Sequence, residues 1–329
     1  MNSAVVEVGG ARLAGKRSVA LLAQFGLLFV FGLLIILFTW KSDTFFTADT
    51  FRTIINIEIA PMLIFAMGLT VVLVMGDFDL SFAATAGVAA YTISAMVVTQ
   101  GQSWVIGVLL AILTGLLVGS VNGYLVAYRK TSSFVITLAM STLLYGFEQI
   151  WSDQKVIQGV EDQAFLNLNS LTGLWNIRVG VFIAIAVVVL VWILLEKTEL
   201  GRYMYAVGGN PEAARLAGID VRRLRLIGFI AVGLASVVVG ILGVAQSGTS
   251  IPRQFDGLLL PAYASVFLGA SVFKPGKFNV AGTVVGCLFL RTIKVGLLSW
   301  GLDTAWINIT QGTILIFAVL LGKLVDQKS

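Results

Sequence analysis

The chain contains no histidine and a single cysteine, Cys287, which lies within an apolar run. Without these side chains it can form no intrachain disulfide, no metal site built from imidazole or several thiolates, and no Ser-His or Cys-His catalytic pair. We therefore expect no metal, no other cofactor and no catalytic residues.

Charged residues are also scarce: they make up 12% of the 329 residues, whereas 58% are hydrophobic. Soluble domains average about 25% charged residues, so this chain has too little polar surface to be solvated by water alone. The 35 glycines agree with this, because small residues let membrane helices pack closely. The composition predicts a single all-α integral membrane domain. The net charge of +5 does not indicate nucleic-acid binding, because the basic residues lie between hydrophobic segments.

The hydrophobic segments are long enough to be membrane spans, since a helix needs about 20 apolar residues to cross the hydrocarbon core. Pro61 and Gly76 fall near the second and third segments, which could therefore be one broken helix and another. Interruptions at membrane depth are tolerated where the backbone is buried in protein. We predict about ten spans: 19–38, 54–75, 80–98, 104–127, 132–151, 179–195, 224–245, 257–272, 279–298 and 306–322.

The distribution of Lys and Arg predicts the orientation. With ten spans and an inner N-terminus, fifteen of the 22 basic residues fall on inner segments and five on outer ones. We expect a cytoplasmic tail 1–18, a transmembrane domain 19–325 with an inner loop 196–223, and a cytoplasmic tail 326–329. The apolar stretch after residue 18 is too long for the core of a signal peptide, so we interpret it as a retained first span.

A faint internal similarity connects the fourth and ninth predicted spans. Such a pair, crossing in opposite senses, is what an inverted repeat requires, although glycine-rich membrane helices also resemble each other by chance. The similar residues are Gly119, Asn122, Gly123 and Arg129 in one span and Gly282, Gly286 and Arg291 in the other.

The inner loop contains the signals of a short helix over 211–217. Asn210 is a good N-cap and Pro211 suits the first helical position. Glu212 lies in the first turn, where the helix dipole favours negative charge. Gly218 suits the left-handed position that ends a helix. These signals alone favour an ordinary connector between two spans over a functional helix.

The stretch Gly201-Arg-Tyr-Met-Tyr-Ala-Val-Gly-Gly-Asn210, continued by Ala213-Ala-Arg-Leu-Ala-Gly-Ile219, resembles the cytoplasmic loop of the ribose-type permeases of bacterial ABC importers. These belong to the branched-chain amino-acid/sugar permease family. Segments 74–81, 134–138, 268–271 and 282–286 resemble other motifs of that family. The resemblance implies that the loop carries the coupling helix that docks on the ATP-binding subunit. The implied coupling residues are Gly208, Gly209, Asn210, Pro211, Glu212, Ala213, Ala214, Arg215, Leu216, Ala217 and Gly218.

The resemblance also implies partners and a function. The partners would be an ABC ATP-binding subunit, a periplasmic or lipid-anchored substrate-binding protein and a second permease copy, identical or related. The protein would be a multi-pass protein of the bacterial inner membrane that carries a monosaccharide or related polyol by alternating access. Gly10 to Lys16 match the start of a P-loop, but Arg17 stands where Ser or Thr is needed, so ATP hydrolysis is assigned to the partner.

Polar residues within or beside the apolar spans are candidates for the substrate pathway. Sugar hydroxyl groups need hydrogen-bond partners, but structural hydrogen bonds between helices explain the same residues equally well. Asp77 and Asp79 could instead lie at the inner surface or cap the third span. The candidates are Asp77, Asp79, Asn122, Glu148, Gln149 and Gln246, with Glu58 as a further polar residue.

Two other transport functions stay open at this point, as does a non-transporting membrane scaffold. One is a branched-chain amino-acid permease of the same family, although the Gly-Gly-Asn of the loop favours the sugar branch. The other is a stand-alone secondary transporter, which normally needs buried carboxylates or histidines for ion coupling. Such residues are scarce here.

Overall fold

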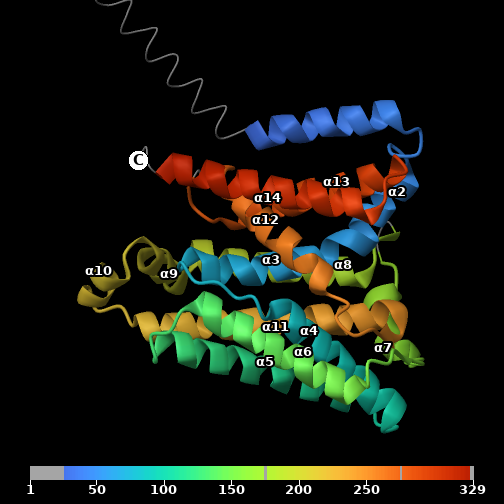
Figure 1. Cartoon of the computed structure of the whole chain (residues 1–329), viewed down its shortest axis with the longest axis horizontal. Helices are drawn as coiled ribbons and strands as arrows, with labels where there is room; N and C mark the ends of the chain where they lie inside the picture. The colour runs from blue at the N-terminus through green and yellow to red at the C-terminus, as the bar shows by residue number, and fades with distance from the viewer. Residues whose placement is uncertain (1–25, 174–175, 275, 327–329) are drawn as a thin grey trace, which may run out of the picture. The chain divides into compact units, whose positions relative to one another are not determined.

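The computed structural model describes residues 26–173, 176–274 and 276–326, and most of these are helical (Figure 1). The predicted tail 1–18, residues 19–25 and residues 327–329 lie outside the described part, as does the P-loop-like segment. The labelled elements are α2 (Ala48–Thr53), η1 (Ile54–Glu58), α3 (Ile59–Val74), α4 (Phe82–Ser94), η2 (Ala95–Thr99), α5 (Trp104–Ala127), α6 (Ser133–Ser152), β1 (Ile157–Gln158), α7 (Gln163–Ser170), α8 (Val179–Trp192), η4 (Ile193–Lys197), α9 (Glu199–Gly209), α10 (Pro211–Leu216), α11 (Val221–Ser247), β2 (Thr249–Ser250), η5 (Asp256–Leu258), α12 (Leu259–Gly269), α13 (Val280–Ser299) and α14 (Thr304–Asp326).

Among the described residues, seven helical stretches are long and apolar enough to cross a membrane. They are Ala48–Val74, Phe82–Thr99, Trp104–Ala127, Ser133–Ser152, Val179–Lys197, Val221–Ser247 and Val280–Ser299. Three shorter apolar helices, Gly26–Lys41, Asp256–Gly269 and Thr304–Leu320, fall on the remaining predicted segments. The all-α membrane architecture is thus confirmed, whereas the number of ten crossing spans stays a prediction.

The second predicted span is continuous, so the suggestion that Pro61 breaks it is wrong. Pro61 lies in the first turn of α3, directly after the π-helical turn η1. A proline inside a helix removes one backbone hydrogen bond, and a π-turn is a common way to absorb such a defect. The real interruption comes at Gly76, whose φ of +81° follows the end of α3.

The described residues group into two compact units, Ala48–Tyr263 and the rest. In the larger unit, α11 lies at the centre and packs on α3, α4 and α5. Gly119 and Gly123 of α5 allow this approach: a β-carbon on Gly119 would lie 2.6 Å from the Phe229 carbonyl oxygen, and one on Gly123 would lie 2.9 Å from Leu226 Cα.

In the smaller unit, α13 packs on α14, and the helix Gly26–Lys41 contacts α13. Phe31 and Phe289 meet edge to face with ring centres 5.7 Å apart, and the Ser42 hydroxyl donates to the Ser299 carbonyl oxygen at 3.0 Å. The glycines of α13 also lie against a neighbouring helix, since β-carbons on Gly282 and Gly286 would clash with the backbone of α12. The predicted inverted repeat nevertheless remains a prediction.

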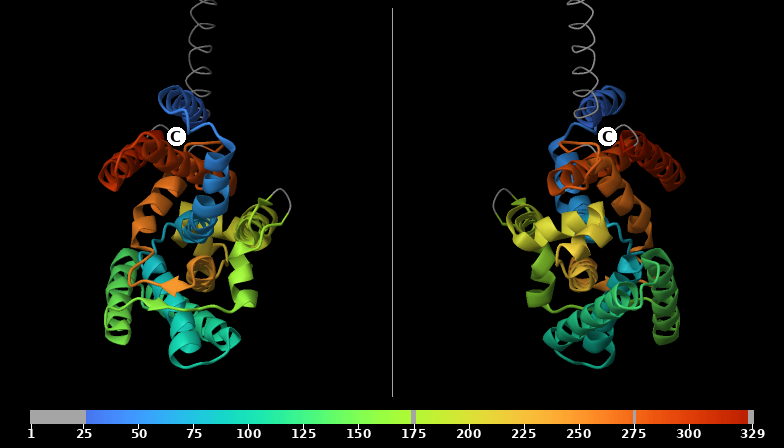
Figure 2. Two further views of the ribbon diagram at one scale, coloured as in Figure 1. Left: turned by 90° about the vertical axis from the view of Figure 1, so that its right-hand side faces the viewer. Right: turned by 90° about the vertical axis from the view of Figure 1, so that its left-hand side faces the viewer.

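The larger unit has two distinct ends, which are used as landmarks below. Helix α11 begins just after α10, and its C-terminal end leads directly into β2. Strand β2 pairs antiparallel with β1, with Ile157 opposite Ser250 (Figure 2, left). We call these the α10 end and the strand end.

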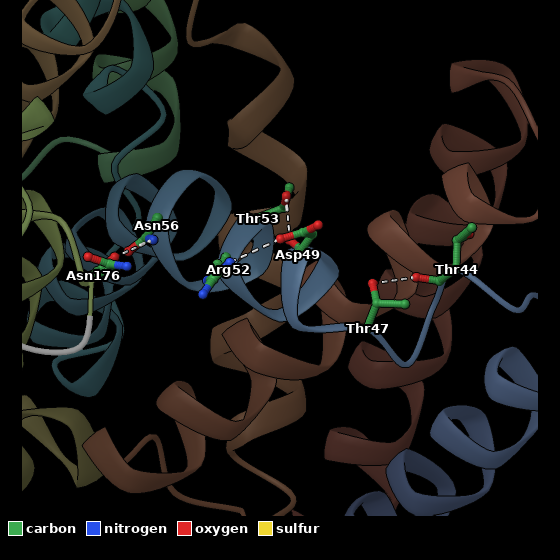
Figure 3. Close-up of polar contacts among 7 residues, drawn as sticks. All are labelled: Thr44, Thr47, Asp49, Arg52, Thr53, Asn56 and Asn176. Atoms are coloured by element: carbon green, nitrogen blue, oxygen red, sulfur yellow. Dashed lines mark hydrogen bonds and ion pairs between the residues drawn. The ribbon is translucent and has the colours of Figure 1, made fainter.

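An ion pair and side-chain hydrogen bonds hold the chain in place around α2 and η1 (Figure 3). Arg52 pairs with Asp49 at 3.1 Å, and the Asn56 amide donates to the Asn176 carbonyl oxygen at 3.0 Å while its own oxygen accepts the Arg178 N–H at 3.0 Å. Asn56 therefore holds the loop that precedes α8.

Candidate functional site

The predicted short helix of the inner loop exists as α10, with the predicted caps at both ends. The Asn210 side-chain oxygen accepts the N–H groups of Glu212 and Ala213, both at 3.0 Å, and Pro211 occupies the first turn. At the other end Gly218 has φ +85°. The Ile219 N–H reaches the Ala214 carbonyl and the Gly218 N–H reaches that of Arg215, both at 3.0 Å, which is the Schellman pattern of helix termination. The helix ends at Leu216, one residue earlier than predicted.

The exposed surface of α10 differs from the one expected from its alanines. Ala214 is buried within the chain, whereas Leu216 is 85% exposed at the tip. Glu212 and Arg215 form an exposed ion pair at 3.0 Å on one face. Because Leu216 is exposed and Ala214 is covered by the chain itself, Leu216, and not Ala214, is the candidate contact residue of α10.

The predicted coupling residues Gly208 and Gly209 belong to the end of α9, not to α10. Helix α9 begins at the Thr198 hydroxyl, which caps the Gly201 N–H at 3.2 Å, and it buries Met204 and Val207. A β-carbon on Gly208 would clash with the Val74 carbonyl oxygen, whereas one on Gly209 would meet nothing within 4 Å. Gly208 therefore lets α9 lie directly against the end of α3.

Between α3 and α4 the chain unwinds over residues 75–81, and the polar groups of this segment are held by the four neighbouring helices α5, α6, α11 and α12. Asp77 pairs with Arg225 of α11, with Oδ2 and Nε 2.9 Å apart. The Phe78 N–H donates to the Ser133 hydroxyl at 3.1 Å, and the Leu80 N–H donates to the Thr137 hydroxyl at 3.0 Å, both on α6.

Asp79 lies at the centre of the segment and is buried. Its Oδ1 accepts the Ser81 N–H at 2.8 Å and the Ser81 hydroxyl at 2.6 Å. The Asn122 amide donates to the same hydroxyl at 2.9 Å. The Tyr263 hydroxyl donates to the Asp79 carbonyl oxygen at 2.7 Å and accepts its N–H at 3.0 Å. Buried polar groups require such partners, and these contacts fix the entry into α4.

The six predicted pathway residues do not form one lining, because the structure divides them between the two ends of the larger unit. Asp77, Asp79 and Asn122 lie toward the α10 end, in the contacts just described. The other three lie toward the strand end. There Glu148 is buried and accepts the Arg253 N–H at 3.3 Å, whereas Gln149 is exposed. Gln246 is exposed beside Asn169, 3.4 Å away.

Several residues of these clusters gave no sequence signal. Arg253 pairs with Asp256 at 2.6 Å and lies 4.7 Å from the centre of the Tyr145 ring, whose hydroxyl donates to Asp256. Tyr263 meets Asp79 across 184 residues of sequence. Neither contact follows from a local pattern, so only the fold reveals these partners.

Two hollows lie at the strand end. One, of about 440 Å³, is lined by Tyr91, Trp151, Gln100 and Gln158 among others. The other, of about 400 Å³, is lined by Gln158, Glu161, Gln246 and Thr249 among others. In the described part of the chain, no three His, Cys, Asp or Glu side chains converge as a metal site would require.

Several helices long and apolar enough to cross a membrane make this a polytopic membrane protein, and an unwound segment between two such helices also occurs in transporters. The family model for the permease component of branched-chain amino acid transport systems matches residues 52–319. The chain belongs to this family.

Individual relatives agree with the family assignment over most of the chain. The chain is 29% identical to the ribose import permease protein RbsC of Escherichia coli K12, covering 88% of this chain and 90% of the relative. It is 32% identical to the L-arabinose transport system permease protein AraH of the same strain, covering 91% and 90%. The D-allose transport system permease protein AlsC is 26% identical, covering 92% and 93%. No solved structure matches the chain.

Proposed function

We propose that this chain is the membrane-spanning subunit of an ATP-driven importer for a monosaccharide or a related polyol, located in the bacterial inner membrane. The observation that carries this proposal is the similarity, over about nine tenths of the chain, to permeases named for ribose, L-arabinose and D-allose. The family description names branched-chain amino acids, but these relatives support a sugar.

The ATP would be hydrolysed by a separate subunit docked on α10. In this proposal the exposed Leu216 enters a groove of that subunit, and the Glu212–Arg215 pair lies at the rim. A rigid, doubly capped helix suits this task because it transmits force without fraying. The proposed coupling surface comprises Glu212, Ala213, Arg215, Leu216 and Ala217, and Gly208 and Asn210 position it.

The contacts behind α10 provide a route into the membrane domain. Helix α10 packs on α9, α9 packs through Gly208 on the end of α3, and Arg225, shortly after α10, pairs with Asp77. A displacement of α10 would therefore act on the unwound segment 75–81 from two sides. Such a segment is where alternating access can change the helix packing.

The α10 end would face the cytoplasm, with both termini on that side, because this orientation places most of the basic residues inside. The strand end would then receive solute from a periplasmic or lipid-anchored substrate-binding protein. A second permease copy would complete the pathway. Neither a nucleic acid nor a cofactor is part of the proposal.

A secondary transporter is the less favoured alternative. Ion coupling normally relies on ionisable residues such as carboxylates or histidines within the membrane. The chain has no histidine, and charged residues make up only 12% of it.

The test has two steps. First, the substrate-binding protein encoded beside the permease gene is screened against monosaccharides, polyols and branched-chain amino acids by thermal shift. Second, uptake of the identified ligand is measured in cells with and without the permease gene, after ATP depletion or addition of an ionophore. We expect a sugar or polyol whose uptake needs ATP. Exclusive binding of leucine or valine would refute the sugar, and uptake abolished only by the ionophore would refute ATP coupling.

A further inference from the structure

One face of α5 is exposed to the surroundings. Its exposed side chains are aliphatic along most of the helix and aromatic at the α10 end. The exposed side chains recur every three or four residues, so they form one stripe on the helix. Each is between 38% and 56% exposed. The members are Leu110, Leu113, Leu117, Val121, Tyr124 and Tyr128.

Arginine guanidinium groups lie beside the two tyrosines at the end of this stripe. The rings of Tyr124 and Tyr128 are stacked, with centres 5.5 Å apart and planes inclined by 19°. Arg129 lies 5.6 Å from the centre of the Tyr124 ring, and Arg222 lies 5.9 Å from that of Tyr128. These distances are within the range of cation–π contacts, so both arginines are held beside the rings.

Arg222 comes from a different helix, and two features fix its position. The Asp220 carboxylate caps α11 by accepting the Arg223 N–H at 3.1 Å. The close packing of Gly123 against Leu226 then fixes α11 beside α5. The cluster is thus built from two helices whose close packing fixes their positions relative to each other.

The positive charge of this cluster is not compensated within the described part of the chain. Arg129, Lys130, Arg222 and Arg223 are exposed, and none lies within ion-pair distance of a described carboxylate. By contrast, Arg202 and Arg215 in the nearby loop each pair with a glutamate three positions before them. The cluster therefore attracts an anion from outside the chain.

The position along α5 identifies the source of that anion. Trp104 and Tyr124 are separated by 20 residues, which span about 30 Å in a helix, the thickness of the hydrocarbon core. Aromatic residues at this spacing mark the two interfaces. Tyr124 and Tyr128 therefore lie at the membrane interface, at one end of the apolar stripe. The negatively charged group present at that depth is the headgroup of a phospholipid.

We propose that Tyr124, Tyr128, Arg129 and Arg222 form a binding site for the phosphate of an anionic phospholipid. The guanidinium groups bind phosphate oxygens, for which their planar geometry is suited, and the acyl chains lie along the stripe from Val121 to Leu110. A second permease copy is a poorer occupant, because a two-fold axis through this face would bring the same cations together.

The experiment measures lipid retention by native mass spectrometry of the full-length protein. The protein is purified in detergent and supplied with an equimolar mixture of phosphatidylglycerol and phosphatidylcholine. We expect the unaltered protein to retain phosphatidylglycerol selectively. The double variant Arg129→Gln/Arg222→Gln should reduce this retention by about tenfold, since each basic residue at a membrane surface contributes substantially to binding an anionic lipid. Tyr124→Leu/Tyr128→Leu should also reduce it, which shows that charge alone is insufficient.

The matched control is Arg202→Gln/Arg215→Gln, which removes the same charge from arginines that already have carboxylate partners and should leave retention unchanged. An equal loss in this control would overturn the proposal, because net charge alone would then explain binding. It would also be overturned if inorganic phosphate at about 50 mM displaced the lipid completely and stabilised the lipid-free protein through the same residues, or if the Arg129 and Arg222 variants lost a dimer but kept their lipid.

Discussion

Asp77 and Arg225 form a partly buried ion pair, with the carboxylate Oδ2 and the guanidinium Nε 2.9 Å apart. Asp77 belongs to the unwound segment between α3 and α4, and Arg225 to the second turn of α11, shortly after α10. The Asp77 side chain is 6% exposed and that of Arg225 25%. This pair therefore ties the unwound segment 75–81 to the helix that follows the loop.

Replacing one residue of this ion pair should lower the unfolding free energy more than the same change in an exposed ion pair. In Arg225→Met the buried Asp77 carboxylate loses the cation that pairs with it among the described residues, and we expect a loss of about 1–3 kcal/mol in unfolding free energy together with reduced uptake. Arg202→Met is the matched control: its pair with Glu199 spans 3.6 Å and both side chains are more than half exposed, so we expect about 0–0.5 kcal/mol. Thermal unfolding of the purified variants compares the two, and equal losses would contradict this role of the pair.

Two adjacent glycines at the end of α9 should respond differently to the same substitution. Gly208→Ala places a methyl group against the Val74 carbonyl oxygen, whereas the corresponding space at Gly209 is open. We expect Gly208→Ala to lose about 1–3 kcal/mol of stability through overpacking and to impair uptake. Gly209→Ala should stay within about 0.5 kcal/mol of the unaltered protein. Unfolding and uptake measurements check this, and a harmless Gly208→Ala would show that α9 does not need its close contact with α3.

The packing of α5 on α11 allows a similar comparison. A β-carbon on Gly119 would lie 2.6 Å from the Phe229 carbonyl oxygen, whereas one on Gly146 of α6 meets nothing within 4 Å. Gly119→Ala should therefore separate the two helices and lower the unfolding temperature. Gly146→Ala should leave it unchanged or raise it slightly, because alanine favours helix more than glycine does. If both variants unfolded at the same temperature, the glycine contact would not be a determinant of this interface.

The sequence was sufficient for features that depend on local chemistry. The span 104–127 matches α5 at both ends, and the caps of α10 at Asn210 and Gly218 were predictable because each acts on backbone groups within a few residues. Hydropathy likewise located the apolar helices, since length and apolar character suffice to recognise them.

Features that depend on distant packing could not be predicted in this way. The two alanines of α10, Ala213 and Ala214, look alike in the sequence, but the packing of α10 against the rest of the chain buries only Ala214. In the same way the pairing of Asp77 with Arg225 requires the loop to return α11 beside the unwound segment. The π-turn η1 that accommodates Pro61 also has no local signature.

The orientation of the loop can be tested by labelling. In a Cys287→Ser background, Ala217→Cys at the exposed end of α10 and Leu171→Cys in the loop after α7 offer two exposed positions. Val207 would be unsuitable because it is buried. An impermeant thiol reagent added to spheroplasts should label Leu171→Cys, and Ala217→Cys only after lysis. Labelling of Ala217→Cys in unlysed cells would place the α10 end outside and refute the proposed topology.

The central claim is that α10 binds the ATP-binding subunit through its exposed tip. Leu216 is 85% exposed and its side chain takes no part in the core, so Leu216→Glu should leave the fold intact. A carboxylate in an apolar groove is costly, and the variant should therefore insert normally but fail to bind its partner.

The most direct measurement is co-purification of the co-expressed ATP-binding subunit with the Leu216→Glu permease. Leu171→Glu, a change of the same type at a residue that is 53% exposed in the loop after α7, is the control. We predict that Leu216→Glu retains less than about a tenth of the ATP-binding subunit, as expected for the loss of a central apolar contact, whereas Leu171→Glu retains it fully. Full retention by Leu216→Glu would contradict the account and leave α10 as a plain connector between two spans.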